Sequence, residues 1–153
     1  EHNTPSSLEG MGALAASRNV NLLYLPMRFA AHRSPGEGIR KTYSLWDAYI
    51  HADFVTYPSL YEGFGNALLE ALYFRKPLLV NRYPVYRDDI EPVGIEAVAI
   101  DGQITDDAVV AVRELLSDPD RVARMVEHNF ATARQHFSYE AVEPLLINLL
   151  QPL

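Results

Sequence analysis

Short apolar runs alternate with stretches of helical spacing along most of this chain. Four runs have the β-branched, aliphatic and aromatic composition typical of buried strands: residues 21–25, 54–57, 77–80 and 97–100. Elsewhere apolar residues recur every three or four positions, which predicts helices near residues 8–15, 43–50, 64–72, 86–90, 106–116, 119–130 and 138–149. Residues 26–38, rich in Pro, Gly, Arg, His and Ser, are predicted to form a long loop.

Strands that alternate with helices, joined by connections too long for hairpins, indicate a parallel sheet. The predicted fold is α/β: a doubly wound, Rossmann-like parallel sheet with helices on both faces and a helical C-terminal end. No repeat, low-complexity tract or change of composition divides the chain, so residues 1–153 are expected to form a single domain. Ligands of such sheets bind at the carboxyl ends of the strands, which places the loop from Pro58 to Gly65 at the expected binding edge.

Polar residues mark the predicted helix starts, because their side chains can accept hydrogen bonds from the first backbone amides. Ser6 or Ser7 is expected to begin the first helix, and Asp106 or Asp107 the helix after the last strand. The two helices that follow are expected to begin at Asp118-Pro119 and at Ser138.

Composition excludes several classes of protein. The formal net charge is −7 and no Lys or Arg run interrupts it, so no nucleic-acid partner is expected. The chain has no Cys, which removes disulfides, thiolate zinc sites and cysteine nucleophiles and favours a cytoplasmic location. No apolar run approaches the roughly 20 residues that span a bilayer. Residue 1 is Glu, and the opening segment lacks the character of a protein start, so the chain is expected to be part of a longer protein.

The segment from Leu60 to Leu72, LYEGFGNALLEAL, carries the most specific chemistry. A helix that begins near Phe64 would present amides without intrahelical partners at the binding edge, where the helix dipole also favours an anion. Gly63 and Gly65 lack a Cβ, which lets a phosphate oxygen or a sugar approach the backbone. Glu62 precedes that helix and Glu70 lies inside it, so the two carboxylates suit separate contacts along one elongated ligand.

Other interpretations of this segment remain open at this point. The two glutamates could be solvated surface residues that only stabilise a helix. They could also be the acid and base of a glycoside hydrolase, although such a pair is commonly supplied by separate strands or loops. The full dinucleotide fingerprint and the phosphate-binding loop sequence are both absent from the chain.

Residues Ala52 to Leu72, together with Arg75-Lys76-Pro77 and the strand that follows, resemble the nucleotide-sugar-binding C-terminal domain of the retaining group 1 glycosyltransferases with the B-type fold. The resemblance includes the Pro58-Ser59 bend, the Gly63-Phe64-Gly65 loop and the E-x7-E spacing of the glutamates. More loosely it extends from about Leu8 to Tyr139. It implies a hexosyltransferase of carbohydrate biosynthesis that moves a sugar from a nucleoside diphosphate sugar to an acceptor hydroxyl.

The resemblance also assigns roles to the residues of the motif. It implies that Glu70 binds the ribose hydroxyls of the donor and that Glu62 acts as the catalytic carboxylate beside the reacting carbon. The amides of Phe64, Gly65 and Asn66 would contact the sugar and the diphosphate, with Gly63 in the same loop. No cofactor and no metal is implied, because the nucleotide sugar is a substrate.

Residues outside the motif are weaker candidates. Met27 and Arg28 follow the first predicted strand and are candidate neighbours of the nucleobase or substrate, or parts of an ordinary loop. Arg82 and Tyr83 follow the third strand and could reach the substrate or could only cap and solvate their loop.

A B-type glycosyltransferase needs a second, N-terminal domain, and by the resemblance that domain is missing from this chain. The fragment alone is therefore expected to be nearly inactive. The acceptor would be a sugar, a lipid or a small polyol. A B-type-fold epimerase or phosphorylase, or a non-catalytic nucleotide-sugar-binding module, is the alternative function.

Overall fold

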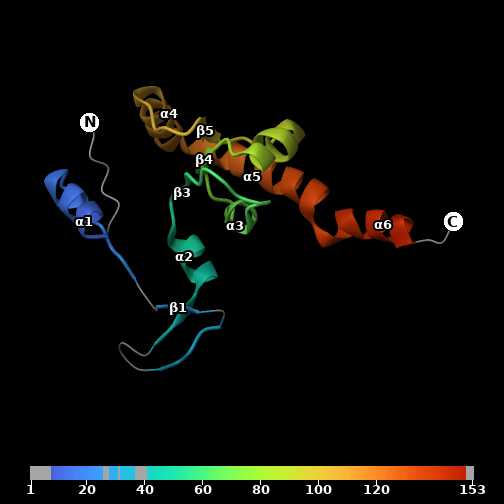
Figure 1. Ribbon diagram of the computed structural model, residues 1–153, viewed down its shortest axis with the longest axis horizontal. Coiled ribbons are helices and arrows are strands. Elements are labelled where there is room, and N and C mark those ends of the chain that lie inside the picture. Colours follow the sequence, from blue (N-terminus) through green and yellow to red (C-terminus); the bar gives the residue numbers. More distant parts are fainter. Residues whose placement is uncertain (1–7, 26–27, 31, 37–40, 151–153) are drawn as a thin grey trace. The chain divides into compact units, whose positions relative to one another are not determined.

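The computed structural model describes residues 8–25, 28–30, 32–36 and 41–150 (Figure 1). The chain divides into two compact units, residues 1–45 and 46–153. The first unit contains helix α1 (Leu8–Ser17) and two short parallel strands, β1 (Phe29–Ala30) and β2 (Tyr43–Ser44). An isolated bridge joins Ser34 to Thr42 beside them. The residues expected to begin the first helix, Ser6 and Ser7, lie outside the described part of the chain.

Two predictions for the first unit are wrong. Residues 21–25 form no strand, and all five are exposed, Leu23 at 71%. An apolar run becomes a strand only where a neighbouring strand satisfies its amides and carbonyls, and the described residues of this unit pair no strand with it. Conversely, β1 lies inside the predicted loop 26–38, because the amide of Tyr43 bonds to the carbonyl of Arg28 and begins the pairing with β2.

The second unit contains the predicted α/β arrangement. Its sheet has three parallel strands in the order β3 (Val55–Tyr57), β4 (Leu78–Asn81) and β5 (Val98–Ile100). Helix α3 (Asn66–Tyr73) connects β3 to β4, and a π-helix (Tyr86–Ile90) followed by a 3-10 helix (Glu91–Val93) connects β4 to β5. The remaining helices are α2 (Leu45–His51), α4 (Asp106–Ser117), α5 (Pro119–Phe137) and α6 (Tyr139–Leu150).

Helices cover both faces of this sheet, as the fold class requires. All four residues of β4 are buried, which is typical of a central strand in a parallel sheet. Leu78 and Val80 point into a core formed with α3, the π-helix and α5, whereas Leu79 points into a second core formed with α4. This alternation follows from the period of two along a strand. Because the three strands are parallel, the carboxyl ends of β3, β4 and β5 lie at the same edge of the sheet.

The helix starts after β5 follow the predicted capping chemistry. Thr105, one residue before the predicted Asp106, accepts a hydrogen bond from the amide of Ala108 at 3.2 Å. Asp118 accepts one from the amide of Arg121 at 2.9 Å, directly before Pro119. Ser138 Oγ accepts one from the amide of Ala141 at 3.2 Å. Among the described residues, no helix combines the length and the apolar character needed to span a bilayer.

Candidate donor-binding site

The loop that follows β3 ends in a left-handed turn at Gly65. This residue has φ 91° and precedes the first residue of α3, Asn66, so the helix begins two residues later than predicted. A right-handed helix cannot pass through a positive φ, which is why Phe64 and Gly65 remain outside it. Gly63 lies in open space, since a Cβ at that position would meet no atom within 4 Å. Packing among the described residues therefore does not require a glycine at position 63.

The first turn of α3 leaves backbone donors at the carboxyl edge of the sheet. The amides of Leu68 and Leu69 both bond to the carbonyl of Gly65, at 3.0 and 3.3 Å. The preceding amides, those of Asn66 and Ala67, have no intrahelical acceptor because no helical turn comes before them. Glycine at the cap position supplies no side-chain acceptor either. This helix start can therefore donate hydrogen bonds to an anionic group.

Glu62 lies beside a tyrosine that ends the neighbouring strand. The hydroxyl of Tyr57, the last residue of β3, hydrogen-bonds to the half-buried Glu62, and Ser59 hydrogen-bonds to the same phenol. Burial and then the Glu62 carboxylate raise the pKa of Tyr57. The phenol consequently keeps its proton at neutral pH and donates it to Glu62, an acceptor-only group when ionised.

Glu70 also has a tyrosine neighbour. The buried Tyr49 of α2 lies beside Glu70 and donates its one proton to the carbonyl of Ala67 at 3.1 Å. Burial, followed by the negative charge of Glu70, raises the pKa of Tyr49 to about 12. Its ring stacks on Phe74 with centroids 5.4 Å apart, which fixes α2 against α3. Each glutamate of the motif therefore lies beside a protonated phenol, and the Tyr57 phenol hydrogen-bonds to Glu62.

Other large apolar side chains of the helix predicted at residues 43–50 do not share this burial. Trp46 is 59% exposed and Ile50 is 56% exposed, and Tyr43 belongs to β2 instead of the helix. Tyr49 is therefore the buried aromatic residue of α2.

Asn81 connects the three loops at this edge of the sheet. It is the last residue of β4 and is 4% exposed. Its Nδ2 donates to the carbonyl of Ser59 at 3.0 Å, and its Oδ1 accepts from the amide of Gly102 at 2.6 Å. The side chain thus holds the loops after β3 and β5 on either side of β4.

Asn81→Ala is expected to destabilise the protein by about 2–3 kcal/mol, because it removes both hydrogen bonds of a buried side chain, each worth about 1–1.5 kcal/mol. Thermal or urea unfolding measures this change. Asn148→Ala, at an exposed position of α6, is the matched control and should change stability by less than about 0.5 kcal/mol. Equal effects of the two substitutions would show that Asn81 does not hold the loops.

The Arg82 side chain is engaged in ion pairs at the same edge. Its Nε lies 3.0 Å from both carboxylate oxygens of Glu91, and its Nη1 lies 3.1 Å from Asp101. These contacts bind the loop after β4 to the 3-10 helix and to the loop after β5, which is the capping role considered from the sequence. A contact with substrate would be additional to them.

The described structure does not test the two remaining candidates. Met27 lies outside the described residues. Arg28 belongs to the first unit, where its guanidinium donates to the carbonyl of Lys41 at 3.4 Å. Both remain predictions from the sequence.

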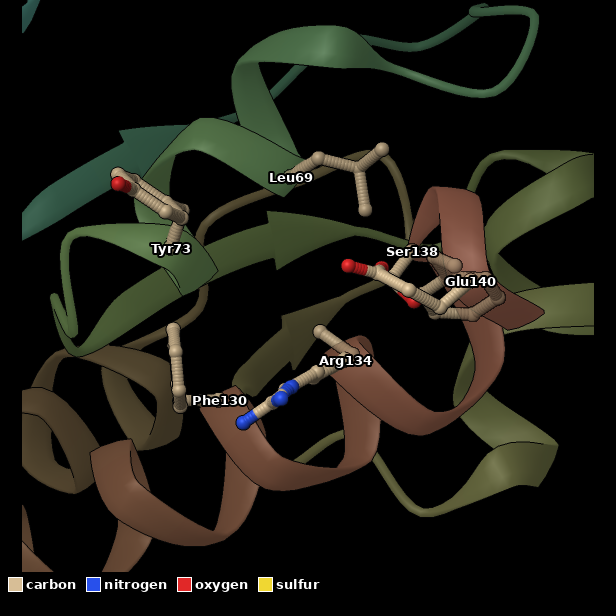
Figure 2. A pocket seen from close by; sticks show the side chains of 8 residues that line it. Leu69, Tyr73, Phe130, Arg134, Ser138 and Glu140 are labelled. Atoms are coloured by element: carbon tan, nitrogen blue, oxygen red, sulfur yellow. The ribbon is translucent and has the colours of Figure 1, made fainter. Parts of the chain in front are cut away.

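A cavity of about 430 Å³ lies elsewhere, between α3, the end of α5 and the start of α6. Figure 2 shows Leu69 and Tyr73 of α3 on one side of it, and Phe130 and Arg134 of α5 on the other. None of the predicted site residues lines this cavity. The candidate site is instead the start of α3, because its first amides lack intrahelical acceptors and lie between Glu62 and Glu70 in the chain, whereas the cavity is mainly apolar.

Sequence reasoning missed the residues that support the site from outside the motif. The sequence pattern predicts only a helix at Tyr49 and a strand at Tyr57, and it does not single out Asn81. No spacing signal connects these positions to the motif, since they come together only when α2, β3 and β4 pack.

Comparison with known proteins assigns the part of the chain that contains the motif to a protein family. Residues 39–131 match the family of glycosyl transferases group 1. Mannosylglucosylglycerate synthase of Thermotoga maritima is 37% identical over 159 aligned positions, which cover 95% of this chain and 35% of that protein. The protein of the same name from Petrotoga mobilis is 55% identical over 58 residues, or 38% of this chain and 14% of that protein. The chain thus spans about a third of the length of the first relative, and no solved structure matches it.

Proposed function

Because the chain belongs to the group 1 glycosyltransferases, we propose that it is the donor-binding half of a retaining enzyme. The enzyme transfers a hexose from a nucleoside diphosphate sugar to an acceptor hydroxyl and keeps the anomeric configuration. The bond between the anomeric carbon and the diphosphate oxygen breaks, the acceptor oxygen bonds to the same face of that carbon, and the acceptor proton leaves with the nucleoside diphosphate.

One observation carries this proposal. The start of α3, whose first backbone amides have no intrahelical acceptor, lies between the two motif carboxylates along the chain. Glu62 lies before α3 and Glu70 is its fifth residue, about 6 Å along the helix from Asn66 at 1.5 Å per residue. Each carboxylate lies beside a tyrosine. A ligand with hydroxyl groups at both ends and an anionic centre complements this order of groups.

The proposed roles follow the chemistry of each group. Glu70 accepts two O–H bonds from the ribose of the donor. The amides of Asn66 and Ala67, together with those of Phe64 and Gly65, donate to the diphosphate and the sugar, where the helix dipole also favours negative charge. Glu62 binds hydroxyls of the transferred sugar and stabilises the positive charge that develops at the anomeric carbon.

The names of the relatives suggest the substrate class. Both are mannosylglucosylglycerate synthases, so we place this protein among enzymes that build a glycoside of mannose, glucose and glycerate. A nucleoside diphosphate mannose is the proposed donor and a glucosylglycerate the proposed acceptor. The acceptor site and the rest of the catalytic apparatus are proposed to lie in a second domain, so residues 1–153 alone should be nearly inactive.

A screen of nucleoside diphosphate sugars by thermal shift on the complete protein tests the proposal. A ligand that binds the native state at 100 times its Kd stabilises it by about 2.7 kcal/mol. GDP-mannose and UDP-glucose, each compared with its free nucleotide, are suitable probes. The proposal expects a rise in melting temperature with at least one of them, and no shift with any nucleotide or nucleotide sugar would refute it. Turnover of a donor without an acceptor would instead indicate an epimerase, and turnover that requires inorganic phosphate would indicate a phosphorylase.

Glu70→Gln is expected to raise the donor KM by roughly 10- to 100-fold while kcat changes little. Glutamine keeps one acceptor oxygen, so one ribose hydroxyl exchanges a charged acceptor for a neutral one and the other loses its acceptor; bonds to charged groups are worth about 1.5–3 kcal/mol and neutral bonds about 0.5–1.5 kcal/mol. Ribose binding is common to the ground and transition states, so the loss appears in KM. Steady-state kinetics at saturating acceptor measure both constants. The opposite pattern, an unchanged KM with a large loss of kcat, would move Glu70 from the ribose to the reacting centre.

A further inference from the structure

The carboxyl ends of β3 and β4 carry two tyrosines that meet directly beneath the donor loop. Tyr57 ends β3, and Tyr83 follows β4 by two residues. The strands are neighbours in a parallel sheet, with Tyr57 opposite Val80. The two rings pack edge to face, with centroids 6.2 Å apart and planes at 78°. This is a favourable geometry for an aromatic pair, and it directs both hydroxyls toward the loop between Glu62 and Gly65.

Tyr83 supports the backbone of the turn into α3. Its side chain is 1% exposed, and its hydroxyl donates to the carbonyl of Phe64 at 3.0 Å. The same oxygen lies 2.6 Å from the position that a Cβ on Gly65 would occupy. Tyr57 approaches that position as well, with its hydroxyl at 3.3 Å and a ring carbon at 3.4 Å. The two phenols therefore fill the space under the Phe64–Gly65 peptide.

Both phenols remain hydrogen-bond donors at neutral pH. Burial is the main cause that raises the pKa of Tyr83 to about 12, and the charges of Tyr57 and Glu62 add to it. The pKa of Tyr57 is raised by burial and by its hydrogen bond with Glu62. A buried hydroxyl is costly unless it finds an acceptor. The acceptors here are the Phe64 carbonyl for Tyr83 and the Glu62 carboxylate for Tyr57.

We propose that Tyr57 and Tyr83 are positioning residues of the donor site: Tyr57 fixes the carboxylate of Glu62, and Tyr83 fixes the peptide that leads into the free amides of α3. The inference rests on the proposed function. A carboxylate held by one donor keeps its other lone pairs for the sugar, and a fixed peptide keeps the first amides aimed at one point. Neither tyrosine belongs to the E-x7-E motif.

The test is steady-state kinetics of the complete protein with GDP-mannose or UDP-glucose, whichever donor it uses. Tyr57→Phe removes only the hydroxyl and should lower kcat by about 10- to 100-fold, because misplacement of a catalytic group by about 1 Å has effects of this size. The donor KM should change less than about threefold, since the amides and Glu70 are untouched. Tyr83→Phe should raise the donor KM by about 5- to 10-fold, the loss expected for a displaced set of backbone donors.

A second set of variants separates positioning from stability. Tyr86→Phe removes a phenol from the same core cluster without a contact to the loop, so it should retain the wild-type kcat and KM. Melting temperatures of all variants show whether the folded fraction has changed. If Tyr83→Phe does not fold, Tyr57→Phe alone still decides the assignment of Tyr57.

A double substitution shows whether Tyr57 acts through Glu62. Glu62→Asp withdraws the carboxylate from the phenol by one methylene group. Adding Tyr57→Phe to Glu62→Asp should then lower kcat by less than about threefold, because the contact is already broken. A multiplicative loss would overturn the inference, as would a wild-type kcat for Tyr57→Phe or a wild-type KM for a folded Tyr83→Phe.

The same data distinguish this inference from the proposed function. If Glu62→Gln retains wild-type transfer, the catalytic role of Glu62 is wrong, and the inference falls with it. If Glu62→Gln is inactive while Tyr57→Phe is fully active, the proposed function stands and only the positioning role is refuted.

Discussion

Glu62→Gln in the complete protein is expected to reduce kcat for sugar transfer by about 10²- to 10³-fold, the effect of removing one preorganised group that stabilises transition-state charge. Glutamine has the shape of glutamate but no negative charge, so the loss measures the charge itself. The donor KM should change far less than kcat if the interaction strengthens mainly in the transition state. Initial rates of nucleoside diphosphate release at saturating acceptor measure this effect.

The fold should tolerate the Glu62 substitution. Glu62 is half-buried in a loop, and its hydrogen bond with Tyr57 can be replaced by the amide oxygen of glutamine. Glu114→Gln, on the exposed face of α4, is the matched control for removal of one negative charge and should leave kcat unchanged. A fully active Glu62→Gln variant would remove this residue from the reaction.

Gly65→Ala should have the largest effect on stability, about 2–5 kcal/mol. Two causes add: a non-glycine residue in the left-handed region costs about 1–2 kcal/mol, and the added Cβ would stand 2.6 Å from the hydroxyl of Tyr83. Overpacking of this kind costs about 1–3 kcal/mol. Urea or thermal unfolding measures the loss, and the donor KM should rise because the first amides of α3 shift with the turn.

Alanine substitutions at two other glycines separate the conformational cost of Gly65→Ala from its steric cost. Gly102 has φ 79° with open space around its Cβ position, so Gly102→Ala should show the conformational cost alone. Gly63→Ala meets no atom within 4 Å and should leave stability nearly unchanged. Should Gly65→Ala be no more destabilising than Gly102→Ala, the two tyrosines do not crowd the turn.

The sequence predicted the sheet of the second unit because its strands are short apolar runs between capped helices. Phe54 to Tyr57, Leu78 to Val80 and Val98 to Ile100 each pack against helices on both faces, so composition and burial agree. Residues 21–25 have a similar composition but are exposed. The strands of the second unit each have a neighbouring strand to pair with, whereas residues 21–25 do not among the described residues. A local apolar pattern does not show whether such a neighbour exists.

The candidate site was predicted in part for the same reason. The glutamates, the glycines and the helix lie within one segment, so spacing and resemblance identified them together. The start of α3 was placed near Phe64, because helical spacing does not reveal that Gly65 adopts a positive φ. The tyrosines and Asn81 reach the loop from other elements, and their contacts with Glu62, Glu70 and Ser59 exist only in the folded chain.

The most direct test of donor binding and transfer is the product of one reaction, followed by NMR. The complete protein is incubated with GDP-mannose and a glucosylglycerate acceptor, with UDP-glucose as the alternative donor. The expected result is one glycoside formed for each nucleoside diphosphate released, with the donor's anomeric configuration in the new bond and no product from Glu62→Gln. A glycoside of inverted configuration, or release of nucleotide without a glycoside, would contradict the proposed function.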